Sequence, residues 1–208
     1  MKNIEILETK KPVNYQDALI YMEKKISLVK NNTSKELIWL LEHPSIYTTG
    51  RGYHIERKSI NKIPLYNTGR GGKITWHGPG QRVVYFIINL KKRNIDIRRF
   101  VNNIENLIIK SLKELKINAY KRDNMIGIWT LDKDRNDAKI GSLGLRVSKG
   151  IIYHGLSLNV SCNLSPFYNI EVCGVKNPKV TSINDLLGFI DNKFVDRILK
   201  NNLNLLFL

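Results

Sequence analysis

Apolar residues change their spacing along this chain in an order that restricts it to folds containing both helices and strands. Residues 13–30 and 96–116 carry apolar side chains at helical spacing. Strand-length apolar runs lie at residues 36–42, 83–90, 118–121, 125–131, 139–147 and 151–160. A turn at residues 148–150 joins the last two as a hairpin, and helices near residues 182–187 and 191–205 end the chain. This order predicts an α+β fold, in which helices flank a mixed sheet.

The length of 208 residues is enough for one sizeable core. No composition break, internal repeat or low-complexity linker divides the chain, so we expect a single domain spanning residues 1–208. Residues 50–72 are rich in glycine and basic side chains and predict a long loop.

The chain is strongly basic, with 34 Lys and Arg against 18 Asp and Glu and a formal net charge of +16. Such a charge predicts attraction to polyanions such as nucleic acid, anionic lipid or an acidic protein. Lysine outnumbers arginine 23 to 11, and Asn and Ile are also abundant, so a biased codon supply is an equal explanation. The content of 42% hydrophobic and 25% charged residues excludes a disordered or collagen-like chain.

Two cysteines, Cys162 and Cys173, are too few for a disulfide framework, and no Cys/His cluster has the spacing of a zinc site. We therefore expect a reduced, cytoplasmic setting, no metal and no cofactor. The first residues lack the continuous apolar core of a secretion signal. No run reaches the ~18 apolar residues that a membrane-spanning helix needs, so no membrane span is expected.

The segment from Arg70 to Gln81, RGGKITWHGPGQ, is the most unusual stretch, because Gly and Pro surround His77 between apolar strands. Glycine permits tight conformations and lets backbone N–H groups approach a ligand closely. The segment has neither the GxxxxGK[ST] spacing of a P-loop nor GxGxxG after a strand. It predicts a substrate-binding loop of another kind, or an ordinary glycine-rich turn.

Two single residues are further candidates for chemistry. Cys173, beside Gly174, is a possible nucleophile, although a lone cysteine is commonly a small buried apolar residue. Cys162 lies in a polar stretch at a strand end and is the other cysteine against which Cys173 must be weighed as the nucleophile. Lys139 opens a strand interrupted by glycines, which often let a ligand come close. A lysine without that context is a solvated surface charge.

In this order and spacing, five motifs together resemble the lipoyl(octanoyl) transferase family, which moves an octanoyl group from acyl carrier protein to a lysine of lipoate-dependent enzymes. The motifs are LEHP at Leu41–Pro44, RGGKITWHGPGQ at Arg70–Gln81, KIGSLGLRV at Lys139–Val147, YHGLSLNV at Tyr153–Val160, and SPF followed by CGV at Cys173–Val175. They extend over most of the chain, and the second is highly specific.

The resemblance implies a fold similar to the catalytic domain of biotin and lipoate ligases. It also implies that Cys173 accepts the acyl group and that Lys139 activates the thiol. The substrate-binding residues that it implies are Arg70, Gly71, Gly72, Lys73, Ile74, Thr75, Trp76, His77, Ser142, Leu143, Gly144, Gly155, Leu156 and Ser157.

A thioester donor and an amide product require a nucleophile that can itself carry a thioester, and cysteine does so. With an ordinary pKa near 8.5, only about 3% of a thiol is ionised at pH 7. A cation at ~4 Å, with an effective dielectric of ~20, contributes up to about 4 kcal/mol toward ionisation. Lys139 fits this role by resemblance, and a Cys/His pair with His77 or His154 is the alternative. Leu143, Leu156 and Trp76 are candidate walls for the eight-carbon chain.

The resemblance implies octanoyl-acyl carrier protein as an acidic donor. The implied acceptors are lipoyl domains of 2-oxoacid dehydrogenases and the H-type protein of glycine cleavage. An ATP-dependent lipoate or biotin ligase is the alternative enzyme, and it would activate a free acid as an adenylate without needing a thiol. An RNA-binding domain is a second alternative, but the scarcity of arginine and of RNP-like aromatic stretches argues against a nucleic-acid partner.

Overall fold

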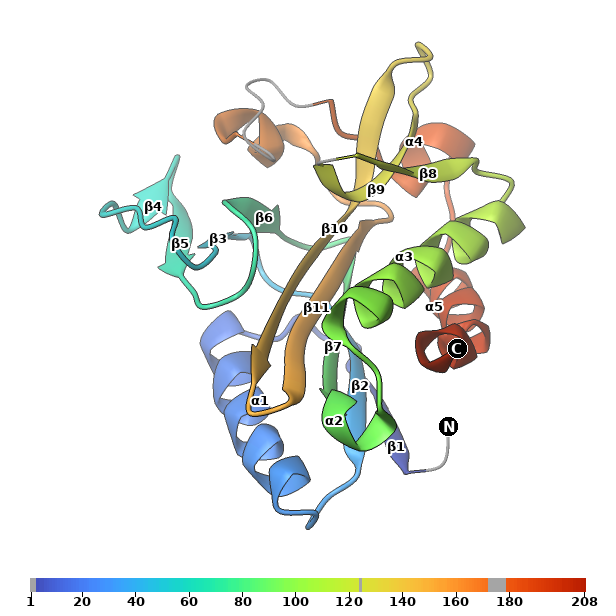
Figure 1. The fold of residues 1–208 in the computed structure, drawn as a ribbon. Coiled ribbons are helices and arrows are strands. Elements are labelled where there is room, and N and C mark those ends of the chain that lie inside the picture. Colours follow the sequence, from blue (N-terminus) through green and yellow to red (C-terminus); the bar gives the residue numbers. More distant parts are fainter. Residues whose placement is uncertain (1–2, 124, 172–178) are drawn as a thin grey trace.

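A seven-stranded mixed sheet forms the centre of the computed structural model, which describes residues 3–123, 125–171 and 179–208 (Figure 1). Its order is β1 (Ile4–Glu8), β2 (Glu36–Leu41), β7 (Gln81–Asn89), β11 (Ile151–Asn159), β10 (Asp137–Ser148), β9 (Met125–Leu131) and β8 (Ala119–Arg122). Only the β1–β2 pair is parallel. The predicted α+β class with a mixed sheet is therefore confirmed.

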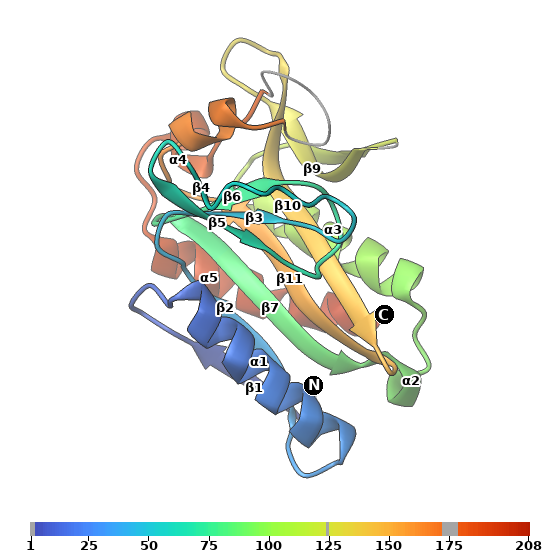
Figure 2. The same ribbon diagram turned by 90° about the vertical axis from the view of Figure 1, so that its left-hand side faces the viewer.

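Helices cover both faces of this sheet. One face packs against α1 (Tyr15–Lys30), and the other packs against α3 (Ile97–Glu114) and α5 (Asn192–Asn201) (Figures 1 and 2). Helix α3 lies where the spacing over residues 96–116 predicts one, and the Asp96 side chain caps its start by accepting a hydrogen bond from the Arg99 backbone N–H at 2.9 Å. Shorter helical segments are α2 (Leu90–Arg93), α4 (Ile183–Leu187), η1 (Ser165–Asn169) and η2 (Leu203–Phe207).

The two faces carry separate apolar clusters. On the α3 side, Phe86, Phe100, Ile104 and Leu158 belong to one large core. On the α1 side, a smaller cluster joins Met22 and other residues of α1 to the opposite faces of β2 and β7. The helical spacing of apolar residues in α1 and α3 is what lets each helix press one stripe onto the sheet.

A small second sheet lies beside the first, in the order β4 (Ser59–Ile60), β5 (Ile63–Asn67), β3 (Ile46–Thr49) and β6 (Thr75–His77). The prediction of a long loop over residues 50–72 is thus wrong in part, since β4 and β5 lie within it. The Asn67 side chain bonds Thr49 and both backbone groups of Ile55, so side-chain hydrogen bonds order a segment whose composition resembles a loop.

The other differences concern short or terminal elements. Strands β1, β3 and β6 are only three to five residues long, which is too short for periodicity alone to identify them. The last long helix ends at Asn201, and η2 continues the chain where one helix to residue 205 was expected. The β10–β11 hairpin is confirmed, with left-handed Lys149 and Gly150 at its turn. No helix in the described ranges is long and apolar enough to cross a membrane.

Candidate functional site

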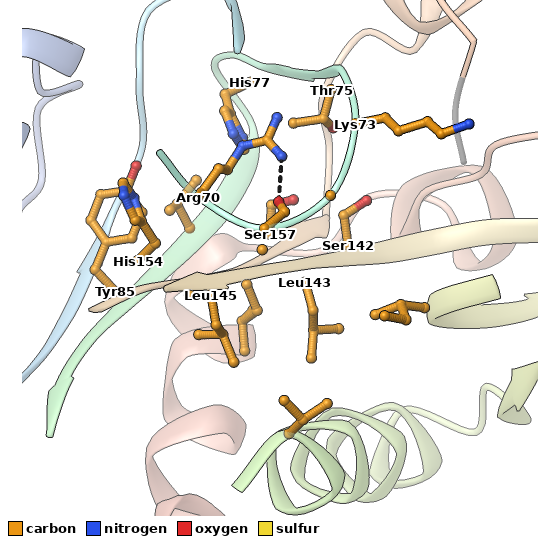
Figure 3. Close-up of a pocket in the computed structure, with 18 of the residues that line it drawn as sticks. Arg70, Lys73, Thr75, His77, Tyr85, Ser142, Leu143, Leu145, His154 and Ser157 are labelled. Carbon is orange, nitrogen blue, oxygen red and sulfur yellow. Dashed lines mark hydrogen bonds between the residues drawn. The ribbon is translucent and has the colours of Figure 1, made fainter. Parts of the chain in front are cut away.

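A cavity of about 470 Å³ lies between β10 and β11 on one side and the segment from Arg70 to His77 on the other (Figure 3). It brings together most of the residues predicted from the sequence. Its lining includes Arg70, Gly71, Gly72, Lys73, Ile74, Thr75, His77, Lys139, Ser142, Leu143, Gly144, Gly155, Leu156 and Ser157. Residues from three segments distant in sequence therefore line one cavity.

Trp76 is the exception among these segments, and its assignment as a wall for the acyl chain is corrected. Strand side chains alternate between faces, so Thr75 and His77 line the cavity whereas Trp76 points to the opposite side. The Trp76 indole donates a hydrogen bond to Ser45 at 2.9 Å and packs edge-on against Phe167. Trp76 therefore packs on the side of the segment that faces away from the cavity.

Only one of the two cysteines lies in the described part of the chain. Cys173 lies outside the described residues, so its predicted position beside Lys139 stays a prediction. Cys162 is buried in a separate apolar cluster and does not line the cavity. Burial raises the pKa of the Cys162 thiol to about 12, which keeps it protonated at neutral pH. Cys162 is thus unsuited to be a nucleophile.

Lys139 is a buried cation on the cavity wall, with only 4% of its surface exposed. Its Nζ donates a hydrogen bond to the Ile126 carbonyl oxygen at 2.8 Å and lies 5.7 Å from the Trp129 ring centroid. Gly127 makes room for it, because a Cβ there would lie 2.7 Å from Nζ. The irregular pairing of β9 and β10 between Lys139 and Gly141 sets this side chain in place.

Arg70 is a second buried cation, and it anchors the glycine-rich segment. Its guanidinium donates to the carbonyl oxygen of Thr48 at 2.6 Å, to the Thr48 hydroxyl and to the Gly71 carbonyl oxygen. Burial lowers the Arg70 pKa from its ordinary value. The Gly71 N–H then donates to the Leu145 carbonyl oxygen at 2.9 Å, which fastens the segment to the edge of β10.

His77 and His154 both line the cavity, and burial lowers the pKa of each to about 3. Charge repulsion from Arg70 acts in the same direction on both. His77 Nδ1 donates to the Gln81 side-chain oxygen at 2.7 Å, which leaves its Nε2 as the acceptor. Both rings are neutral at physiological pH, and a conjugate acid with so low a pKa makes them weak general bases.

The cavity also has walls that sequence reasoning missed. They include Tyr15 from α1, Tyr85 from β7, Val101 from α3, and Leu145 and Val147 from β10. In the sequence, Tyr15 and Val101 are apolar positions of two predicted amphipathic helices. No neighbouring motif marks either of them as a cavity residue. Side chains alternate between the two faces of a strand, so the prediction of Leu143 could have been extended to Leu145 and Val147 on the same face of β10.

The arrangement can hold an elongated, largely apolar group and place its reactive end beside a buried ammonium. Apolar side chains supply much of the lining, while Ser142, Ser157 and the glycine-rich backbone supply hydrogen-bonding groups. Within the described ranges, no cluster of three or more His, Cys, Asp or Glu could hold a metal ion.

Comparisons with known proteins agree with this geometry. Residues 14–202 match the protein family described as the lipoyl protein ligase A/B catalytic domain. Octanoyltransferase from Ehrlichia chaffeensis is 39% identical over 94% of this chain and 92% of that protein. Octanoyltransferase from Wolbachia pipientis subsp. Culex pipiens is 42% identical over 93% of this chain and 95% of that protein.

Solved structures share the fold at low sequence identity. Lipoate-protein ligase A bound with ATP has a TM-score of 0.72 at 18% identity, over 98% of this chain and 84% of that chain. Biotin protein ligase from Aquifex aeolicus has a TM-score of 0.58 at 16% identity, over 99% of this chain and 71% of that chain. These likenesses confirm the predicted fold similarity to lipoate and biotin ligases.

Proposed function

The chain belongs to the octanoyltransferase family of lipoyl protein ligase A/B catalytic domains, and on this premise we propose that it carries the octanoyl group as a thioester on Cys173. It is an acyltransferase that moves octanoyl groups. The proposal adds the nucleophile, the residue that activates it and the two protein partners. The observation that carries the proposal is the buried ammonium of Lys139 on the wall of a cavity suited to an acyl chain.

In the first step, the Cys173 thiolate attacks the carbonyl carbon of octanoyl-acyl carrier protein. The carbon–sulfur bond to the donor breaks, and the donor leaves as a thiolate that takes up the proton of the Lys139 ammonium. Exchange between two sulfur atoms is nearly balanced in energy, so the intermediate forms without an added energy source. Lowering the thiol pKa by ~2 units needs about 2.7 kcal/mol, and one nearby ammonium is sufficient for this.

In the second step, the uncharged amine of an acceptor lysine attacks the acyl-cysteine. The new amide bond forms, the Cys173 sulfur leaves as a thiolate, and the amine proton passes to a base. Lys139, whose amine is uncharged after the first step, is the group we assign to this proton relay, because the neutral rings of His77 and His154 accept a proton poorly. Arg70–His77, Ser142–Gly144 and Gly155–Ser157 hold the acyl group during both steps.

The partners we propose are those that membership of the family implies. The donor is octanoyl-acyl carrier protein, an acidic protein that the net charge of +16 would steer toward the enzyme with strong salt dependence. The acceptors are lipoyl domains of 2-oxoacid dehydrogenases and the glycine cleavage H-type protein. The reaction requires no cofactor, and we retain a reduced cytoplasmic setting, in which the thiol stays available.

Intact mass after incubation with octanoyl-acyl carrier protein tests the nucleophile and the class of enzyme together. We expect a gain of one octanoyl group in the wild type and in Cys162→Ala, and none in Cys173→Ala. Full transfer by Cys173→Ala, or a requirement for ATP with free octanoate, would instead support the ligase alternative, whose fold this chain shares.

Lys139→Met tests the activating residue in the same assay. We expect acylation to slow by about 100-fold or more, because ~2 pKa units of thiol activation are lost. Lys133→Met, a change at an exposed lysine of the β9–β10 turn, is the matched control and should acylate at the wild-type rate. An unchanged thiolate titration curve in Lys139→Met contradicts the electrostatic assignment.

A further inference from the structure

His154 has a backbone conformation that strands rarely contain. Its φ angle is +62°, in the left-handed region. The pairing of β11 nevertheless keeps its register on both sides, with Leu145 opposite His154 and Tyr85 opposite Gly155. A left-handed conformation is unfavourable for a residue with a Cβ, so its presence inside a regular strand indicates that the side chain serves a purpose at one particular place.

The left-handed φ changes the face on which the side chain lies. Ile152 and Leu156 belong to the core on the α3 side, and regular alternation would send residue 154 into that core. The His154 ring instead stacks on Tyr153, with centroids 5.0 Å apart, and meets Tyr85 edge-on at 6.1 Å. Both tyrosines pack on the α1 side. The imidazole is thus turned out of the core and into the cavity (Figure 3).

A rigid network supports the ring at this place. The Tyr85 hydroxyl donates to His43 Nε2 at 2.7 Å, and His43 Nδ1 donates to the Val13 carbonyl oxygen at 2.7 Å. His154 is only 3% exposed, and its Nδ1 has no hydrogen-bond partner in the described part of the chain. The cavity is therefore bounded here by a fixed ring that carries an unpaired nitrogen.

Lys139 lies at the opposite end of the same floor. Ile140 and Leu143 both face the core on the α3 side, because the pairing of β10 with β9 shifts register between Lys139 and Gly141. Lys139 and Ser142 therefore share the opposite face of β10. Leu145, the partner of His154, follows Lys139 by six residues, a span of about 20 Å at ~3.3 Å per residue. A lysine side chain and an extended eight-carbon acyl chain together fill a span of this order.

The cavity has a second branch, on the α3 side of β10, where Leu143 and Leu145 point toward α3 (Figure 3). This branch is open, because Ile97 and Val147 on its walls are 38% and 45% exposed. A chain lying there would keep methylene groups in water. The branch that ends at His154 is enclosed by buried residues, so hydrophobic burial favours it for the acyl chain.

We propose that His154 is a specificity-determining residue that sets the length of the transferred acyl chain by closing the enclosed branch. This inference rests on the proposed function. An eight-carbon chain ends before the ring. A longer chain would have to displace the imidazole from between Tyr153 and Tyr85, or press methylene groups against the unpaired ring nitrogen of His154.

The test is the kcat/KM ratio for decanoyl against octanoyl carrier protein. His154→Gly accepts the left-handed conformation and removes the ring, so we expect the ratio to rise by about 10-fold or more as two further methylenes become buried. Lys149→Gly replaces another left-handed residue, at the turn of the same hairpin, and should leave the ratio within twofold.

An unchanged ratio in His154→Gly overturns the inference while octanoyl transfer by the wild type still supports the proposed function. Absence of octanoyl transfer in the wild type removes the function itself. If His154→Gly does not fold, His154→Asn tolerates the same backbone with a shorter side chain, and we expect a smaller rise in the ratio. A rise in Leu143→Ala but not in His154→Asn would place the chain on the α3 side and overturn the inference.

Discussion

The two faces of the central sheet bury different kinds of side chain. On the α3 side, a large apolar core includes Phe100, and the buried cation Arg82 is paired there with Asp196 at 2.7 Å. On the other face, the cavity buries the cations Arg70 and Lys139 and two neutral histidines. Apolar burial stabilises a fold, whereas buried charge and unpaired polar groups destabilise it unless they are compensated. Apolar burial on the α3 side therefore stabilises the fold. This stability offsets the cost of burying charged and polar groups at the cavity on the other face.

Of the substitutions that test this comparison, Phe100→Ala should have the largest effect on the free energy of unfolding. Phe100 is fully buried and packs against Phe86 with ring centroids 5.8 Å apart, so we expect a loss of about 3–5 kcal/mol in the free energy of unfolding. Urea denaturation measures it. Phe194→Ala, at a side chain that is 46% exposed, is the control and should change stability by less than about 0.5 kcal/mol. Equal losses in both variants would contradict the assignment of stability to the α3 face.

Acid should weaken the polar face. Burial lowers the pKa of His43 to about 4, against an ordinary value of about 6.5, so the folded state favours the neutral ring. The resulting stability is fully present above pH ~6.5 and is lost as the pH falls toward 4. Between pH 7 and pH 5 this one group accounts for up to about 2 kcal/mol. His77 and His154 act in the same direction.

His43→Gln isolates this contribution. Urea denaturation at pH 7 and pH 5 should show a smaller loss of stability on acidification in the variant than in the wild type. A variant with the same pH dependence as the wild type would show that His43 is not held neutral by the fold.

The smallest effect concerns the stability of the β10–β11 hairpin, in which Lys149 and His154 have left-handed backbone conformations. Lys149, at the turn, has a φ of +51° and serves no cavity. Lys149→Asn creates the Asn-Gly pair that such turns favour, so we expect stability to rise by about 0.5 kcal/mol with octanoyl transfer unchanged. Thermal unfolding and the transfer assay measure the two outcomes. A decrease in stability would mean that the lysine side chain, and not the backbone, matters at this turn.

Elements with strong local signals were predictable from the sequence. Asp96 before an amphipathic run indicated the start of α3, and Lys149-Gly150 between two apolar runs indicated the hairpin. Strands β3, β4, β5 and β6 were not recognised, because they are short and because β3 pairs with β5 and β6, which lie far along the chain. In the same way, the segment at Arg70–His77 was recognisable as a site, but the direction in which Trp76 points depends on how β6 pairs.

The amino-acid sequence alone determined the fold class, the family and the three segments that meet at the cavity, because each depends on residue types at fixed spacing. Only the tertiary structure decided which side chains face that cavity. His154 lies there through a single φ angle, and Lys139 is buried there because Gly127 leaves it space. Such placements result from how neighbouring strands pack against each other in space, and no local pattern of residues encodes them.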